Sequence, residues 1–286
     1  MPITAEKLKY EYMPGTPFAQ VAVNEVDFTI EDGSFVGVIG HTGSGKSTLI
    51  QLLAGLLKPT SGKVYLDGED INEKGYDKKK LRRKIGVLFQ YPEYQLFEES
   101  VAKDIAFGPE KAGFDAVEVD KKVREAMRLV GLDYEKFASK SPFELSGGEK
   151  RKVAIAGVLA TQPQILILDE PIAGLDPKGR EELMSMVREL NANGTTIIMI
   201  SHNMDDLAEY TTRVLAMNKG DLYLDGTPRE VFSRYGHLKR AGLDLPETGK
   251  LVQMLRDRGV LIEREIVTKD QLMAALKKLL SEKKDD

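Results

Sequence analysis

The sequence predicts an α/β fold built on a mostly parallel β-sheet that is covered on both faces. Short apolar runs with the length of strands occur at 35–39, 85–89, 165–169 and 195–201. Segments with helical spacing of apolar residues alternate with them, and this alternation is typical of parallel sheets buried on both faces. A polar feature follows each strand, and ligands bind outside the carboxyl ends of such strands. We therefore expect four polar features to converge at one edge of the sheet.

Length and composition limit the classes of protein to which the chain can belong. Its 286 residues suffice for one large or two modest domains. The formal net charge of −4 argues against a generally basic nucleic-acid-binding protein. The absence of cysteine excludes a disulfide scaffold and a thiolate metal site, and it fits a cytosolic protein. We find no signal-peptide pattern and no apolar run near the roughly 20 residues of a membrane helix, so any membrane role should act through a partner.

The N-terminal region has the pattern of a β-rich segment. Residues 3–32 predict short strands joined by a turn at Pro14-Gly15 and Pro17. Another strand is predicted at 62–68, between two turn signals. The basic run at 74–84 has two interpretations that stay open, a solvated helix face or a contact with an acidic partner or lipid headgroups.

The remainder of the chain is predicted to be mainly helical between the apolar strands. Residues 91–163 are helix-rich, and further helices are expected at 178–191 and 203–210. A hairpin is expected at 214–224, around Asn218-Lys219-Gly220. Short helices and a charged end at 229–286 predict a small C-terminal extension.

The segment from Gly40 to Thr48 matches the P-loop pattern, G-x-x-x-x-G-K-[ST], between an apolar strand and a helix-like run. Its glycines let backbone N–H groups point at phosphate oxygens, and the helix adds the positive end of its dipole. Lys46 can reach the outer phosphates and Ser47 can hold Mg²⁺. His41 occupies a free position of the pattern, so its side chain is assigned no chemistry. The predicted nucleotide-binding residues of this loop are Gly40, His41, Thr42, Gly43, Ser44, Gly45, Lys46, Ser47 and Thr48.

Two consecutive carboxylates follow the apolar strand at 165–168. Asp169 should emerge from the buried strand beside Ser47 and bind Mg²⁺, usually through a water. Glu170 points elsewhere and can orient or deprotonate an attacking water. Carboxylates without a function are uncommon at the end of a buried strand, because their desolvation is costly.

Two further polar residues end predicted strands. Gln90 can bind Mg²⁺ or water with its amide and respond to the γ-phosphate, and His202 is placed to contact the γ-phosphate. Ser146, Gly147 and Gly148 precede a helix predicted at 149–159, which gives a second anion-binding feature. Two phosphate-binding features in one chain are consistent with two nucleotides shared across a dimer.

Together these motifs resemble those of the ATPase subunit of ABC transporters, along residues 3–232. The Q-loop glutamine would be Gln90, the signature motif 145–149, the D-loop 173–176 and the switch histidine His202. The signature departs from the common LSGGQ by ending in Glu149. That exchange keeps Ser146 and both glycines and alters only the last contact of the motif.

Within that family, segments 89–109 and 141–160 resemble the energy-coupling factor (ECF) type ATPases. The opening at 10–23 is similar to the second of the two paired ATPases in those vitamin transporters. The resemblance implies a P-loop NTPase fold of the ABC ATPase type, with an antiparallel N-terminal β subdomain. It implies a nucleotide-binding domain at 1–228 with a helical subdomain at about 91–163, and a C-terminal extension at 229–286 as a possible dimerisation module.

The resemblance also implies the ligands, the partners and the site. ATP and Mg²⁺ would lie between the P-loop of one ATPase and the signature of a sister ATPase, in a head-to-tail heterodimer. Adenine would stack on Tyr12, with Tyr10 as the alternative, and Asp176 would couple the two sites. The pair would act at the cytoplasmic face of the cell membrane, on a membrane-embedded coupling protein and substrate-binding membrane components, for uptake of vitamins or other micronutrients. No nucleic acid is expected as a partner. We expect the coupling protein to dock near Tyr91 to Phe97.

Two other functions are compatible with parts of this pattern. The ATPase of another ABC importer or exporter would use the same chemistry with different partners. A soluble ABC-type ATPase acting on DNA or ribosomes is disfavoured, because only one P-loop exists and about 120 residues without a heptad run separate the motif halves.

Overall fold

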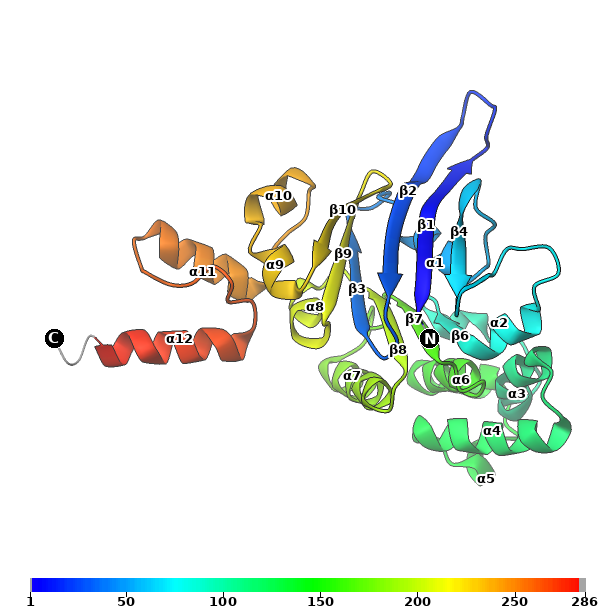
Figure 1. Cartoon of the computed structure of the whole chain (residues 1–286). Coiled ribbons are helices and arrows are strands. Elements are labelled where there is room, and N and C mark those ends of the chain that lie inside the picture. The colour runs from blue at the N-terminus through cyan, green and yellow to red at the C-terminus, as the bar shows by residue number, and fades with distance from the viewer. Residues whose placement is uncertain (1, 283–286) are drawn as a thin grey trace.

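The computed structural model describes residues 2–282, which form two β-sheets and the helices around them (Figure 1). The larger sheet has six strands in the order β10-β9-β3-β8-β7-β6. All its neighbouring strands pair in parallel except β9 and β10, which form the predicted hairpin. The strands are β3 (Phe35–Gly40), β6 (Ile85–Leu88), β7 (Ile165–Asp169), β8 (Thr196–Ile200), β9 (Arg213–Asn218) and β10 (Asp221–Gly226).

The smaller sheet is antiparallel and has the order β2-β1-β4-β5. Its strands are β1 (Ile3–Tyr12), β2 (Gln20–Ile30), β4 (Ser61–Leu66) and β5 (Glu69–Asp70). The turn at Pro14-Gly15 lies where it was predicted, but β1 and β2 are long strands rather than short ones. The pairing shifts register near Lys7 and Glu25, which both have positive φ, so irregular positions interrupt the alternating pattern without ending the strands.

The two faces of the six-stranded sheet are buried against different layers. Alternate residues of β7 point to opposite sides, with Ile165 and Ile167 in one core and Leu166 and Leu168 in the other. One core lies between this sheet, α1 (Lys46–Leu53) and the antiparallel sheet. The other lies under α3 (Val101–Ala112), α4 (Ala116–Leu129), α6 (Gly147–Leu159), α7 (Pro177–Ala192) and α8 (Met204–Tyr210). The predicted covering of both faces of the sheet is confirmed, with helices on one face and with α1 and the antiparallel sheet on the other.

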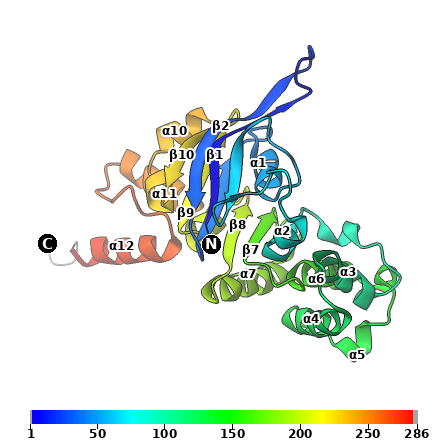
Figure 2. The same cartoon turned by 45° about the vertical axis from the view of Figure 1, so that its right-hand side comes forward.

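The segment from 91 to 163 is helical, as expected. It contains the 3-10 turns η1 (Pro92–Gln95) and η2 (Pro142–Glu144), and the helices α3, α4, α5 (Tyr134–Phe137) and α6. The C-terminal helices lie at the opposite end of the molecule from α3 and α4 in both views (Figures 1 and 2).

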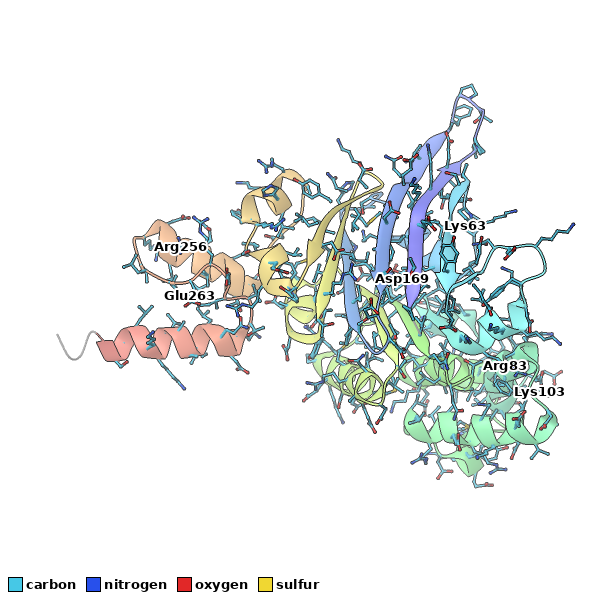
Figure 3. The ribbon with its side chains drawn as sticks, in the orientation of Figure 1. Lys63, Arg83, Lys103, Asp169, Arg256 and Glu263 are labelled. Carbon is cyan, nitrogen blue, oxygen red and sulfur yellow. The ribbon has the colours of Figure 1, made fainter. Side chains whose placement is uncertain are left out.

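The basic run at 74–84 forms α2 (Lys78–Lys84), and several of its charged groups serve the fold. Lys80 and Lys84 form ion pairs with Glu69 and Asp67. The guanidinium of Arg83, labelled in Figure 3, donates to the carbonyl oxygens of Ala112 and Gly113 at 2.8 Å each, which joins α2 to the end of α3. These contacts give the basic run an intramolecular role that neither interpretation from the sequence included.

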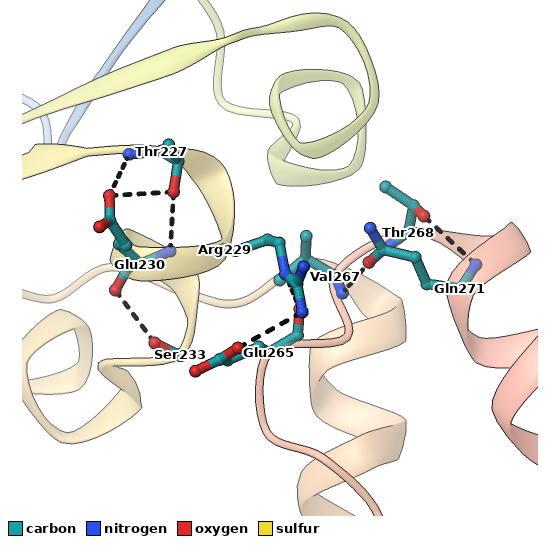
Figure 4. Close-up of polar contacts among 8 residues, drawn as sticks. All are labelled: Thr227, Arg229, Glu230, Ser233, Glu265, Val267, Thr268 and Gln271. Carbon is teal, nitrogen blue, oxygen red and sulfur yellow. Dashed lines mark hydrogen bonds and ion pairs between the residues drawn. The ribbon is translucent and has the colours of Figure 1, made fainter.

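The C-terminal residues form α9 (Pro228–Phe232), α10 (Tyr235–Arg240), α11 (Glu247–Asp257) and α12 (Lys269–Glu282). Helices α9 and α10 contribute Val231, Phe232 and Leu238 to the core that lies under α3, α4, α6, α7 and α8. Helices α11 and α12 enclose a separate small cluster. Thr227 and Glu230 form a capping box at the start of α9, and Arg229 pairs with Glu265 at 3.3 Å (Figure 4). A hydrogen bond joins α11 to α8, because the backbone N–H of Glu247 donates to Oδ1 of Asp205 at 3.0 Å.

Among residues 2–282, no helix combines the length and the apolar character needed to cross a membrane.

Candidate functional site

The parallel strands bring most of the predicted site residues to one edge of the sheet. The P-loop follows β3, Asp169 closes β7, and His202 lies two residues beyond β8. Because β3, β8 and β7 are parallel neighbours, their carboxyl ends lie side by side. Asp169 is labelled in Figure 3 within this part of the sheet. Gln90 was predicted to follow its strand directly, but β6 ends at Leu88 and Gln90 is exposed two residues further on.

The backbone of the P-loop has the form of an anion site. Gly45, the N-cap of α1, has φ 103°, and a Cβ there would lie 2.1 Å from the carbonyl oxygen of Ala22. Because this N-cap has no side chain, the first N–H groups of α1 are left for a ligand. The buried hydroxyl of Ser44 also has no hydrogen-bond partner in the described part of the chain.

Lys46 lies under this loop with 7% of its surface exposed. Its ammonium group donates to the carbonyl oxygens of Gly40 and His41, at 2.7 and 3.0 Å. Burial lowers the pKa of Lys46, and the negative charges of Glu170 and Asp169 act in the opposite direction. The lysine is thus held beside the phosphate-binding backbone, where it interacts electrostatically with both carboxylates.

The two carboxylates after β7 are partly buried. Burial raises the pKa of Asp169, and the charges of Lys46 and His202 reduce that rise. Burial also raises the pKa of Glu170, and His202 again opposes it. Nε2 of His202 lies 3.4 Å from Oε1 of Glu170, and the backbone N–H of His202 donates to Oε2 at 3.4 Å. Glu170 has φ 50°, an uncommon conformation for a residue with a side chain, and such strain clusters at functional sites.

The donors expected for Mg²⁺ fit that ion. Ser47 is exposed on the first turn of α1, and Asp169 and Gln90 supply a carboxylate and an amide. In the described chain no three histidine or acidic side chains gather into a metal site of their own. Mg²⁺ commonly binds one or two protein oxygens and completes its shell with phosphate oxygens and water, so a nucleotide-dependent ion suits this donor set.

Tyr12 is the better placed of the two candidate aromatic residues. It is 41% exposed, and its hydroxyl lies 3.1 Å from Oγ1 of Thr48 in the P-loop. Tyr10 contacts the Tyr12 ring edge-on at 4.9 Å between centroids, but it packs against the apolar core. Tyr12 therefore presents an aromatic face next to the phosphate-binding loop.

The signature segment lies at the N-terminus of α6, whose N-cap is Ser146. Oε2 of Glu149 accepts hydrogen bonds from the hydroxyl and the backbone N–H of Ser146, at 2.6 and 2.9 Å. The hydroxyl bond lowers the pKa of Glu149, so the departure from glutamine gives this helix a charged capping box. Gly147 and Gly148 are exposed, and a Cβ on either would meet nothing within 4 Å.

Asp176 is the N-cap of α7 and accepts a hydrogen bond from the backbone N–H of Gly179 at 2.7 Å. Reasoning from the sequence did not identify two charged residues close to this segment. Arg151, on α6, donates to the carbonyl oxygens of Pro171 and Ala173. Asp206, on α8, is buried and pairs with Arg180 of α7. Arg151 lies one helical turn before the buried Ile155, so helical periodicity could have shown that it faces inward.

Known proteins are similar to this chain in sequence and in fold. A family model described as ABC transporter matches residues 23–173. The chain belongs to the ABC transporter family. A Clostridium perfringens protein named energy-coupling factor transporter ATP-binding protein EcfA2 is 51% identical over 281 residues, which are 98% of this chain and 99% of that protein. A protein of the same name from Caldanaerobacter subterraneus subsp. tengcongensis is 53% identical over 269 residues, 94% of each chain.

Solved structures of ABC proteins have the same fold. The structure of cbiO1 from Clostridium perfringens, described as part of the ABC transporter complex cbiONQ, is 38% identical with a TM-score of 0.71, over 88% of this chain and 98% of that one. The ATP-binding cassette MJ0796, a dimer bound to ADP and Pi, is 29% identical with a TM-score of 0.70, over 79% and 98%. The predicted fold class and family are confirmed, and the chain is an ATP-binding ABC ATPase.

Proposed function

We propose that this ABC ATPase binds and hydrolyses ATP to energise an ECF-type membrane transporter for vitamins or other micronutrients. The observation that carries the hydrolytic part is the cluster of Lys46, Glu170 and His202 at the carboxyl ends of adjacent strands. The near-full-length relatives named energy-coupling factor ATP-binding proteins support the ECF part.

The residues of the site divide the chemistry among them. Lys46 and the N–H groups of α1 bind the β- and γ-phosphates, while Tyr12 stacks on the adenine. Ser47, Asp169 and Gln90 would hold Mg²⁺, which would neutralise charge on the phosphates. Glu170 positions water and accepts its proton, and His202 contacts the γ-phosphate while holding the carboxylate of Glu170 at 3.4 Å.

The signature segment supports a head-to-tail pair with a sister ATPase. The open space at Gly147 and Gly148 is unused by the fold of the chain itself, and Ser146 begins a helix whose N-terminus favours anions. A nucleotide on the P-loop of the sister subunit could approach this backbone closely, and Asp176 lies on the loop that would connect the two sites. The dimeric state of MJ0796 is consistent with such pairing. The C-terminal helices are proposed to contribute to this dimer.

The segment after Gln90 is proposed as the docking site for the membrane-embedded coupling protein. Tyr94 and Phe97 are 84% and 56% exposed, and the rings of Phe97 and Phe107 pack edge-on at 4.9 Å. The backbone N–H groups of Phe97 and Glu98 both donate to Oδ2 of Asp104 at 2.9 Å, which fixes this segment to α3. Leu96 packs against the core, so of Leu96 and Phe97 it is Phe97 that a partner can reach. The ATPase would then be a peripheral protein at the cytoplasmic face of the membrane.

Affinity purification of the tagged chain from membranes of its native host, followed by mass spectrometry, tests the assignment. We expect a sister ATPase, a coupling membrane protein and small substrate-binding membrane proteins. Recovery with a conventional permease pair instead would move the assignment to another ABC importer. Recovery with ribosomes or DNA would refute a role in transport.

A further inference from the structure

Arg151 is a buried cation that binds the segment directly after Glu170. Only 6% of the residue is exposed. One of its terminal nitrogens donates to the carbonyl oxygen of Ala173 at 3.0 Å, and the other donates to that of Pro171. Arg151 itself lies on α6, whose N-cap is Ser146. A single guanidinium therefore ties the signature helix to the residues that follow the proposed catalytic carboxylate.

The same guanidinium has a looser contact on its other side. Oε2 of Glu93, in η1, lies 3.8 Å from a terminal nitrogen of Arg151. This distance permits an ion pair but is too long for a hydrogen bond. Neither Oε2 of Glu93 nor Nε of Arg151 has a hydrogen-bond partner in residues 2–282. A shift of η1 by about 1 Å would bring Oε2 of Glu93 within hydrogen-bonding distance of the terminal nitrogen of Arg151.

Glu93 lies only three residues after Gln90, so the segment proposed to meet the coupling protein reaches Arg151 directly. Tyr91 of this segment also lies near the loop after Glu170, because a Cβ built on Gly174 would be 3.6 Å from the Tyr91 ring. Arg151 is therefore the shared partner of three segments: the turn after Gln90, the loop after Glu170 and the signature helix.

We propose that Arg151 is a positioning residue for ATP hydrolysis. Its hydrogen bonds to the carbonyl oxygens of Pro171 and Ala173 hold the loop after Glu170, and hence Glu170, in place against the signature helix. Its contact with Glu93 transmits displacements of the docking segment to the loop after Glu170 and to the signature helix. Arg151 acts through other residues, because its terminal N–H groups are directed at protein carbonyl groups and a carboxylate. This inference deepens the proposed function and rests on it.

The test compares Arg151→Gln with Arg128→Gln in the purified transporter complex. Arg128 is an exposed arginine on α4, so it controls for loss of the same charge. We expect Arg151→Gln to lower kcat by about 10- to 100-fold, because small misplacements of catalytic groups have effects of this size. The KM for ATP and the affinity for the fluorescent analogue mant-ATP should stay within about twofold, since the P-loop is untouched. Arg151→Lys should be intermediate, because lysine keeps the charge but lacks the planar fork of donors.

Glu93→Gln tests the second contact without removing the buried arginine. We expect a smaller loss of kcat with mant-ATP affinity unchanged, and the double variant with Arg151→Gln should be no slower than Arg151→Gln alone. Additive losses would show that Glu93 does not act through Arg151. Wild-type kcat in Arg151→Gln, or equal losses of kcat, affinity and Tm in both Arg151 variants, would overturn the inference. A wild-type complex without ATP hydrolysis would overturn the proposed function itself, which separates the two failures.

Discussion

The imidazole Nε2 of His202 lies 3.4 Å from Oε1 of Glu170, while the backbone N–H of the same histidine faces Oε2. One residue thereby contacts both oxygens of the carboxylate proposed to activate water. Glu170 is largely buried and His202 is exposed, so a ligand can reach the histidine from solvent. Any nucleotide that displaces His202 therefore also changes the environment of Glu170.

Replacement of Glu170 by glutamine should separate ATP binding from hydrolysis. The amide preserves the shape of the side chain but cannot accept a proton from water. We expect kcat to fall by about 10²–10⁴-fold, with mant-ATP affinity retained and a closed dimer accumulating. Steady-state ATP hydrolysis and size-exclusion chromatography with ATP check this. Normal hydrolysis by the variant in the presence of its partner would show that Glu170 is not the base.

The pH dependence should report the buried state of the same carboxylate. Burial raises the pKa of Glu170 above its ordinary value of 4.5, and only the ionised form can act as a base. As the pH falls, kcat should therefore begin to drop at a higher pH than an exposed glutamate would cause. A pH–rate profile of the wild type measures this loss of kcat at low pH, and the residual activity of Glu170→Gln should not show it. An acid limb centred at the ordinary value would contradict the prediction.

The raised pKa of Glu170 also predicts an effect on the stability of the nucleotide-free protein. A carboxylate whose pKa is raised by folding destabilises the folded state when ionised, and this cost disappears as the pH falls from the folded pKa toward the unfolded pKa. Glu170→Gln should therefore raise Tm at neutral pH by about 2 °C for each kcal/mol gained, and the gain should shrink in acid. Thermal melts across pH test this, and an equal gain at every pH would argue against an electrostatic cause.

Substitution of Gly148 by alanine should impair hydrolysis without damaging the fold. A Cβ at this position meets no atom within 4 Å in the single chain, and alanine favours helix more than glycine by about 0.5–1 kcal/mol. Tm should therefore be unchanged or raised, while turnover by the paired ATPases falls because a methyl group blocks the approach of phosphate. Gly236→Ala, also with open space on α10, is the matched control. Unchanged turnover would argue against nucleotide contact at the signature.

A charge at Phe97 should prevent docking on the membrane partner. Phe97→Glu places a carboxylate on an exposed ring, and we expect loss of the coupling protein in pull-down experiments with mant-ATP binding preserved. Val117→Glu provides the control, because Val117 is 81% exposed on α4 outside the proposed docking segment. Retention of the coupling protein by Phe97→Glu would place the docking surface elsewhere.

Features set by local pattern could be predicted from the sequence. The strands β3, β7 and β8 are buried on both faces, so each is a continuous apolar run in the sequence. These runs predicted the edge of the six-stranded sheet at which Lys46 and Asp169 lie. The full lengths of β1 and β2 could not be read, because the irregular positions near Lys7 and Glu25 break the alternation that marks a strand. The partners of Arg151 were also inaccessible, since they depend on how α6 packs against a loop about 20 residues away in sequence.

The cluster enclosed by α11 and α12 has a consequence for local unfolding of the molecule. Its buried members are Val252, Ile262, Ile266 and Leu272, whereas α9 and α10 share the large core of the ATPase. So few buried side chains stabilise a local unit only weakly. We expect the amides of α11 and α12 to exchange with solvent through openings that leave the sheet intact, at a free energy well below that of global unfolding. The hydrogen bond from Glu247 to Asp205 would break in those openings, so α8 would lose that contact while the ATPase core stays folded.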